Sequence, residues 1–183
     1  MNKTNGIMAE KSKEAISSAL LKVMEIYSYS EITVTQITQE AGLSRKTFYR
    51  HFNDKEQVLE YLFDTLYQEC VEEIIRSGCC HYWDVVLCYF SFWKKHADAI
   101  SLMNRSGLLP KLFEESYKRS FEVFKIVRTE DMVKANADLL PYMLAYSIGG
   151  MHSMLIRWIE SDMAVEPKAL VECLKTTFSS DML

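Results

Sequence analysis

Apolar side chains recur every three to four residues along nearly the whole chain, the spacing that places them on one side of an α-helix. The 183 residues include only 6 glycines and 3 prolines, too few for the many turns that short β-strands require. We therefore predict an all-α fold. The expected helices span, by residue number, about 8–29, 34–41, 44–51, 55–77, 81–96, 98–104, 108–129, 135–160 and 167–178.

The composition is that of an ordinary globular protein, with 49% hydrophobic and 25% charged residues. This mixture excludes a disordered chain, a collagen-like repeat and a disulfide-stabilised miniprotein. The five cysteines form no Cys-x-x-Cys pair, and the first ten residues lack the apolar run of a secretory signal. We therefore expect reduced thiols and a cytoplasmic location.

One stretch, Leu139–Ile156, contains no charged residue and reaches the lower length limit for a membrane span. It also contains Pro141, His152, two tyrosines, two serines and the pair Gly149-Gly150, so its hydrophobicity is modest. We interpret it as a helix buried at a protein interface and predict no membrane segment.

Residues 33–55 combine two short helices with a sharp turn between them. Thr33 and Ser44 are suited to cap the two helices, and Gly42 supplies the turn, because glycine adopts positive φ at little cost. The residues expected to lock the two helices together are all apolar: Ile37, Ala41, Leu43, Phe48 and Phe52. This arrangement predicts a helix-turn-helix with its core at about 33–52.

Positive charge is concentrated in the same segment. The chain has a net charge of −4, yet residues 43–55 contain four basic side chains and one acidic one. A helix that exposes Arg and Lys fits the major groove of DNA, where these side chains donate to guanine O6 and N7. A basic helix can also be a solvated surface. The coincidence of core, turn, caps and basic face favours DNA binding.

At these residues the sequence resembles the TetR/AcrR family of bacterial transcriptional regulators. The resemblance depends on Ala41-Gly42-Leu43-Ser44, Thr47-Phe48-Tyr49-Arg50-His51-Phe52 and Asp54-Lys55-Glu56, and with the flanking helices it covers about the first third of the chain. The rest is similar only in its helical architecture, including a charge-poor penultimate helix with Trp158 near its end.

The resemblance implies a homodimer that binds a palindromic double-stranded DNA operator and is often released by a small ligand. It implies base reading by Arg45, Lys46 and Tyr49, with Thr35 or Gln36 assisting from the preceding helix. It also implies phosphate contacts by Thr47, Arg50, His51 and Lys55, with Ser44 in the same DNA-binding set. In some relatives the position of Lys46 is Gly or Pro, which makes its role the least specific.

We predict a DNA-binding domain over residues 9–69 and a helical regulatory and dimerisation domain over residues 70–183. The predicted function is transcriptional regulation, with repression as the expected mode. The alternative is a helical protein–protein interaction module, or a co-regulator that responds to a protein partner. A small-molecule-modifying helical enzyme has no support in the sequence beyond the cavity considered below.

The second domain contains two further predicted sites. Small residues next to an apolar ridge on the penultimate helix indicate a four-helix dimer interface, although packing within one chain is the alternative. The residues expected there are Met143, Ser147, Met151, Leu155, Leu170 and Leu174. An unidentified small-molecule effector would bind among aromatic side chains, which can equally be plain core: Trp83, Phe90, Trp93, Tyr117 and Phe121.

No catalytic or metal site is expected. Cys79-Cys80-His81 with Cys88 matches no standard zinc spacing, because adjacent cysteines rarely bind one ion in good geometry. A thiol switch at these cysteines stays an alternative. No nucleophile–base group, paired carboxylates or phosphate-binding glycine loop is present, so we predict no enzyme activity and no cofactor.

Overall fold

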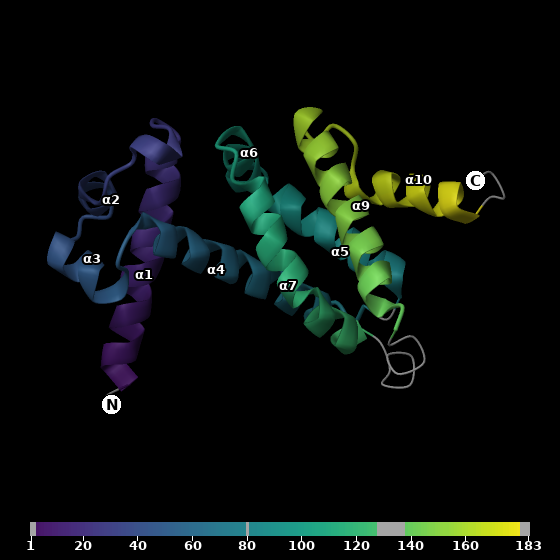
Figure 1. Ribbon diagram of the computed structural model, residues 1–183, viewed down its shortest axis with the longest axis horizontal. Helices are drawn as coiled ribbons and strands as arrows, with labels where there is room; N and C mark the ends of the chain where they lie inside the picture. The colour runs from purple at the N-terminus through teal and green to yellow at the C-terminus, as the bar shows by residue number, and fades with distance from the viewer. Residues whose placement is uncertain (1–2, 80, 128–137, 180–183) are drawn as a thin grey trace. The chain divides into compact units, whose positions relative to one another are not determined.

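The computed structural model describes residues 3–79, 81–127 and 138–179. Over these residues the chain is helical and has no β-strand, which confirms the predicted all-α class. Figure 1 shows the order of the helices. The chain divides into two compact units, Met1–Leu66 and Tyr67–Leu183, and the division falls within helix α4 (Lys55–Arg76).

The N-terminal unit is built from α1 (Lys3–Met24), α2 (Val34–Glu40), α3 (Arg45–His51) and the first half of α4. Helix α1 packs against both α2 and α3, and these two pack against each other. The side chains that fill the space between them are almost fully buried: Ile16, Leu20, Ile37, Phe48, Val58, Leu59 and Phe63. This core holds the two short helices, which are too short to be stable alone.

Helix α1 ends earlier than the sequence indicates. The predicted helix reaches residue 29, whereas α1 ends at Met24 and a 3₁₀ turn, η1 (Tyr29–Glu31), begins after four intervening residues. Ile26 and Tyr27 are exposed, so no apolar partner supports a further helical turn. The apolar face of α1 therefore does not extend to Tyr27.

Helix α1 begins at Lys3, earlier than the predicted start at about residue 8, whereas the predicted starts of α2, α3 and α4 are confirmed by side-chain caps. Thr33 Oγ1 accepts from the Gln36 amide at 3.3 Å, and Gln36 Oε1 accepts from the Thr33 amide at 2.8 Å, a reciprocal capping box. Ser44 Oγ accepts from the Thr47 amide at 3.0 Å. Asp54 Oδ1 accepts from the Gln57 amide at 2.9 Å at the start of α4. Each cap satisfies an amide that the helix leaves free.

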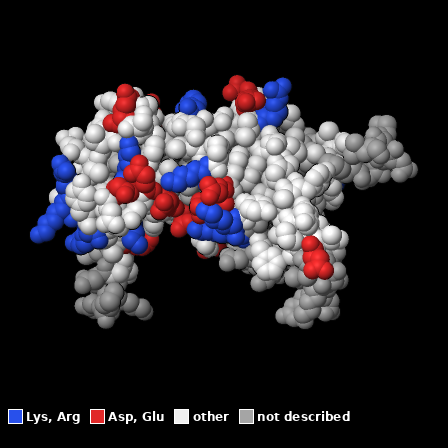
Figure 2. Space-filling model, in the orientation of Figure 1, with Lys and Arg blue, Asp and Glu red and all other residues white. Residues whose placement is uncertain are grey.

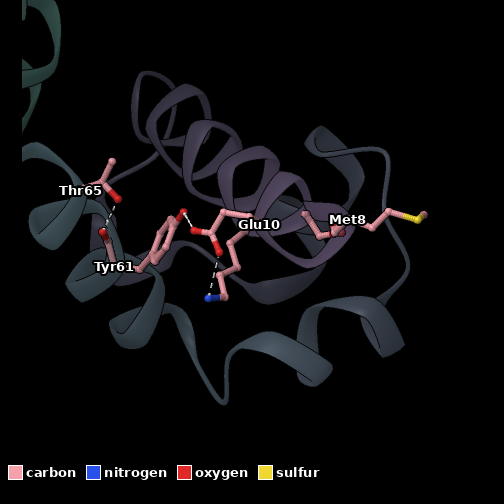
Figure 3. Close-up of polar contacts among 6 residues, drawn as sticks. Met8, Glu10, Tyr61 and Thr65 are labelled. Atoms are coloured by element: carbon pink, nitrogen blue, oxygen red, sulfur yellow. Dashed lines mark hydrogen bonds and ion pairs between the residues drawn. The ribbon is translucent and has the colours of Figure 1, made fainter. Parts of the chain in front are cut away.

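A polar contact joins α1 to α4 within this unit (Figure 3). The Tyr61 hydroxyl donates to Glu10 Oε1 at 2.7 Å, and Lys13 Nζ lies 3.4 Å from the other carboxylate oxygen. The hydrogen bond from Tyr61 lowers the pKa of Glu10 below its ordinary value. The Tyr61 ring also lies edge-on to Phe52, with centroids 5.7 Å apart, so this contact continues into the core beneath α3.

The C-terminal unit contains α5 (Tyr82–Lys95), α6 (Ala97–Arg105), α7 (Leu109–Val127), α9 (Leu140–Glu160) and α10 (Pro167–Ser179). Helix α5 packs against α6 and α10, and α9 packs against α6 and α7. Phe90 on α5 meets Trp158 on α9 edge-on at 5.5 Å. The Trp158 Nε1–H donates to the Val165 carbonyl at 2.8 Å, which fixes the α9–α10 loop.

The predicted helix ends at 128–129 and 135–137 lie outside the described residues. No helix in the part of the chain that the structure describes combines the length and apolarity needed to cross a bilayer.

Gly42 provides a test of the turn between α2 and α3. Its φ is +65°, and a Cβ added there would meet no atom within 4 Å. A side chain at this position therefore meets no steric clash with its neighbours but strains the backbone, which must keep a positive φ. Gly42→Ala should accordingly destabilise the N-terminal unit by about 1 kcal/mol. Gly42→Asn, which tolerates this conformation better, should cost less. Amide hydrogen exchange of α2 and α3 measures both; equal protection in Gly42→Ala and the native chain would contradict the assigned turn.

The Glu10–Tyr61 contact predicts a pH-dependent stability. Because the folded state lowers the pKa of Glu10, its contribution is present above the ordinary value of 4.5 and is lost as pH falls through the lowered value. Tyr61→Phe should reduce the stability of the N-terminal unit by about 1 kcal/mol at pH 7 and by clearly less at about pH 3.5.

Hydrogen exchange of α1 amides checks this prediction. Tryptophan fluorescence does not, because the three tryptophans are residues 83, 93 and 158, all in the other unit. A difference between Tyr61→Phe and the native chain that stays constant from pH 7 to pH 3.5 would show that the Glu10 charge is not involved.

Candidate nucleic-acid interface

The orientation of α3 is set by two buried phenylalanines. Phe48 and Phe52, four residues apart, are buried with Ile37 in the core of the N-terminal unit. A helix that buries residues at this spacing turns the intervening positions outward. Arg45, Lys46, Tyr49 and Arg50 are accordingly exposed. Figure 2 shows Lys and Arg side chains gathered at the edge of the molecule where α3 lies.

Tyr49 and Arg45 lie together on the exposed side of α3. The Tyr49 ring is 49% exposed and rests edge-on against buried Phe48, with centroids 5.4 Å apart. The Arg45 guanidinium carbon lies 5.9 Å from the centre of the same ring, one helical turn away. The core thus supports Tyr49, and Tyr49 in turn supports Arg45. The core therefore holds two of the side chains that are predicted to read DNA bases. Lys46 projects from the same helix, but no aromatic ring contact of this kind is described for it.

Two hydroxyl groups flank the start of α3. Ser44 Oγ and Thr47 Oγ1 lie 3.0 Å apart, with Ser44 exposed and Thr47 half-buried. A hydroxyl can donate one hydrogen bond and accept two, so this pair retains capacity for a phosphate oxygen. Their predicted place in the DNA-binding set stays a prediction that this geometry permits.

The two predicted contributors from α2 differ in availability. Thr35 is exposed on α2. Gln36 is half-buried, and its Oε1 already accepts from both the amide and the hydroxyl of Thr33, at 2.8 Å each. Only the side-chain NH₂ of Gln36 is therefore left for a base edge.

Two predicted phosphate contacts do not fit the structure. His51 Nε2 is buried and lacks a hydrogen-bond partner, and burial lowers the pKa of the ring, so that nitrogen is not presented to a phosphate. Lys55 Nζ donates to the carbonyl oxygens of Tyr29, Ser30 and Ile32, which uses all three of its N–H groups. We therefore withdraw Lys55 as a phosphate contact, and for His51 the burial of Nε2 leaves only the other ring nitrogen for such a contact.

The predicted dimer residues fall on both sides of α9. Leu155 is 0% exposed within its own unit, so the prediction that it contacts a second chain is wrong. Ser147 is half-buried and donates to the Tyr82 hydroxyl at 3.0 Å, Met143 is exposed, and Met151, Leu170 and Leu174 are partly exposed.

The exposed side of α9 combines Met143, one of the predicted contact residues, with two tyrosines and with the small residues that indicate a helix–helix interface in the sequence. Tyr142 and Tyr146 are 75% and 72% exposed, and Gly149, Gly150 and Ser153 continue the same helical face. A Cβ on either glycine would meet no atom within 4 Å. Packing within the chain therefore does not require these glycines to be small. The small residues are the sequence signal for this face, whereas Tyr142 and Tyr146 are missing from the predicted set.

The predicted effector residues are not enclosed together. Phe90 and Trp93 are buried in the core, whereas Tyr117 and Phe121 on α7 are exposed and Trp83 is half-buried. Nearby, His152 stacks on Phe113 with ring centroids 3.8 Å apart, and burial lowers its pKa to about 4, so this ring is neutral.

Burial affects the reactivity of two of the four cysteines that the structure describes. Burial raises the pKa of Cys70 to about 12 and that of Cys88 to about 11, which disfavours the reactive thiolate. Over the described residues, no three His, Cys, Asp or Glu side chains come close enough together to hold a metal ion. Cys80 lies outside the described residues.

Comparison with known proteins agrees with the geometry of the N-terminal unit. The family model described as bacterial regulatory proteins, tetR family, matches residues 16–62, which include α2, α3 and the start of α4. The HTH-type dhaKLM operon transcriptional activator DhaS of Lactococcus lactis subsp. lactis (strain IL1403) is 29% identical over 62 residues, 34% of this chain and 33% of that protein. The HTH-type transcriptional regulator YxbF of Bacillus subtilis (strain 168) is 36% identical over 66 residues, 36% of this chain and 16% of that protein.

A solved structure is similar over most of the chain. The dihydroxyacetone kinase operon activator DhaS superposes with a TM-score of 0.63 and 15% sequence identity, covering 91% of this chain and 93% of that one. At this identity the likeness concerns the fold. The two sequence relatives, by contrast, are matched over only a third and a sixth of their lengths.

The matched domain and these relatives are those of regulators and not of enzymes. The buried phenylalanines, the capped short helices and the exposed basic side chains of α3 lie within or beside the matched residues. Residues 16–62 therefore match the tetR family of bacterial regulatory proteins, and they hold the DNA-binding helix-turn-helix of the N-terminal unit.

Proposed function

We propose that this chain regulates transcription as a homodimer that places two copies of α3 in successive major grooves of a palindromic operator. The observation that carries the proposal is the division of α3 into a buried side and a basic side. Phe48 and Phe52 are buried, while Arg45, Lys46, Tyr49 and Arg50 are exposed. An α-helix with this exposed set fits the major groove, where Arg donates to guanine and other side chains contact phosphates.

The exposed side of α9 supports the dimer. Tyr142 and Tyr146 leave large apolar surfaces in solvent beside Gly149 and Gly150, which have open space around them. Glycine in a helix costs about 1 kcal/mol relative to alanine, and close approach of a second helix is one way to offset that cost. We therefore revise the interface to the exposed face of α9 that is formed by Tyr142, Met143, Tyr146, Gly149, Gly150 and Ser153.

The proposed regulation acts through the spacing of the two α3 helices. Half-sites in successive major grooves lie about 34–36 Å apart, or a multiple of that distance, so a change of a few ångströms would prevent both from docking. An effector in the C-terminal unit would act by shifting α4.

Repression is the proposed mode, because a dimer seated on promoter DNA would exclude the polymerase. Activation is the second candidate, since one sequence relative and the similar solved structure are both named as operon activators. Tyr117 and Phe121 are exposed on α7, where a protein could bind them, so a protein partner is the alternative to a small-molecule effector. Transcription in vitro from a promoter that carries the operator distinguishes the two modes, by a fall or a rise in transcript.

Variants of α3 should separate base reading from general affinity. Arg45→Ala and Tyr49→Ala should weaken operator binding by roughly 10- to 100-fold, because each base contact contributes about 1–3 kcal/mol. Binding to random DNA should change little. Arg50→Ala should weaken both and reduce the slope of log Kobs against log salt by about 1.

Fluorescence anisotropy with operator and random DNA measures these effects, and Arg105→Ala, an exposed cation on α6, is the control. Equal losses in Arg45→Ala and Arg105→Ala would contradict the assignment of α3 as the reading helix. Loss of the dimer in Arg45→Ala would contradict the separation of DNA binding from dimerisation.

A charge on the exposed face of α9 should break the dimer. Gly150→Arg would bury an unpaired cation in the proposed interface and should weaken dimerisation roughly 100-fold. Because Arg favours a helix more than Gly does, α9 itself should persist. Sedimentation velocity measures the dimer, with Glu114→Arg on exposed α7 surface as the matched control. A dimer of unchanged affinity in Gly150→Arg would exclude this face.

A further inference from the structure

The side chain of Lys55 is fully engaged by the backbone of the segment that precedes α2. Its Nζ donates to the carbonyl oxygens of Tyr29 at 2.7 Å, Ser30 at 3.0 Å and Ile32 at 3.0 Å. An ammonium group has three N–H donors, so none is left for another partner. Nζ also lies 4.9 Å from the centre of the Tyr29 ring, which adds a cation–π contact.

The three carbonyls are a natural site for a cation. Tyr29 and Ser30 belong to the 3₁₀ turn η1, and Ile32 follows it directly. Carbonyl groups at the end of a helical turn have a partial negative charge, and the Tyr29 carbonyl accepts from Lys55 Nζ in addition to the Ile32 amide. Lys55 is the first residue of α4, where the helix dipole disfavours a cation. The three carbonyls therefore explain why a positively charged side chain is stable at the start of α4, where the helix dipole alone would disfavour it.

The two ends of this contact bracket the helix-turn-helix. Ile32 is buried and lies directly before Thr33, the residue that caps α2. Lys55 follows the turn that leads from α3 into α4. The hydrogen bond between them therefore closes a loop that contains the whole of α2, the turn and α3.

We propose that Lys55 is a positioning residue that joins the start of α2 to the start of α4 and thereby fixes the helix-turn-helix for operator binding without touching DNA. This role rests on the proposed function of DNA binding. It also provides a way for a movement of α4 to be passed to α2, since Lys55 and Ile32 are directly bonded.

The test compares Lys55→Arg and Lys55→Met in the full chain with Arg50→Ala as the phosphate control. Each is measured for thermal unfolding of the N-terminal unit and for the salt dependence of operator binding. Arg retains the charge but presents a planar fork that does not match three carbonyls around one point. Both Lys55 variants should therefore melt roughly 5 °C lower and bind the operator at least about tenfold more weakly.

The salt dependence distinguishes positioning from direct contact. Both Lys55 variants should keep the native slope of log Kobs against log salt, because no phosphate contact is lost, whereas Arg50→Ala should reduce it by about 1. A Lys55→Met slope reduced by about 1, with native binding by Lys55→Arg and an unchanged melting temperature, would assign Lys55 to a phosphate and overturn the proposal.

Three further outcomes are informative. If Lys55→Arg and Lys55→Met both keep the melting temperature and the operator affinity of the native chain, the proposal is also overturned. If Lys55→Met does not fold, Lys55→Arg decides, since a phosphate contact predicts native affinity and the positioning role predicts a loss. If the native chain binds no DNA in a genome-wide fragment selection, the proposed function fails, and the melting temperatures alone still test whether Lys55 holds the helix-turn-helix together.

Discussion

Burial of Phe48 determines what the N-terminal unit can present to a partner. The ring is fully buried beside Ile37, and with Phe52 one turn later it fixes the rotation of α3 about its axis. Because helical positions three and four apart share a face, this rotation exposes Arg45, Lys46, Tyr49 and Arg50. Tyr49 rests on Phe48 and Arg45 lies over Tyr49, so the core fixes the positions of these two exposed side chains.

The contacts around this core explain how two helices of 7 residues each stay folded. Thr33, Ser44 and Asp54 cap the three helix starts, while Lys55 binds the carbonyls before α2 and Tyr61 binds Glu10 on α1. Each contact joins segments that helix propensity alone would leave free. The unit is therefore a set of short helices held by local caps and two longer-range polar contacts, and DNA binding is proposed to depend on both.

Local features of the site could be predicted from the sequence, and long-range ones could not. The caps at Thr33 and Ser44, the turn at Gly42 and the buried Phe48 depend on neighbouring residues, and each is confirmed. Lys55 and His51 were assigned by residue type and resemblance. The carbonyls that bind Lys55 lie 23–26 residues away in the sequence, and Nε2 of His51 is buried without a hydrogen-bond partner. On α9 both faces are apolar or small, so the pattern did not indicate that Leu155 faces inward and Gly150 outward.

The central claim is that two copies of α3 read one symmetric DNA site, and selection of genomic fragments followed by guanine methylation protection tests it most directly. We expect an enriched palindrome in which guanine N7 atoms are protected in two half-sites, centred about 10 base pairs apart or a multiple of that spacing. Binding without an enriched sequence, or protection confined to the minor groove, would contradict the account.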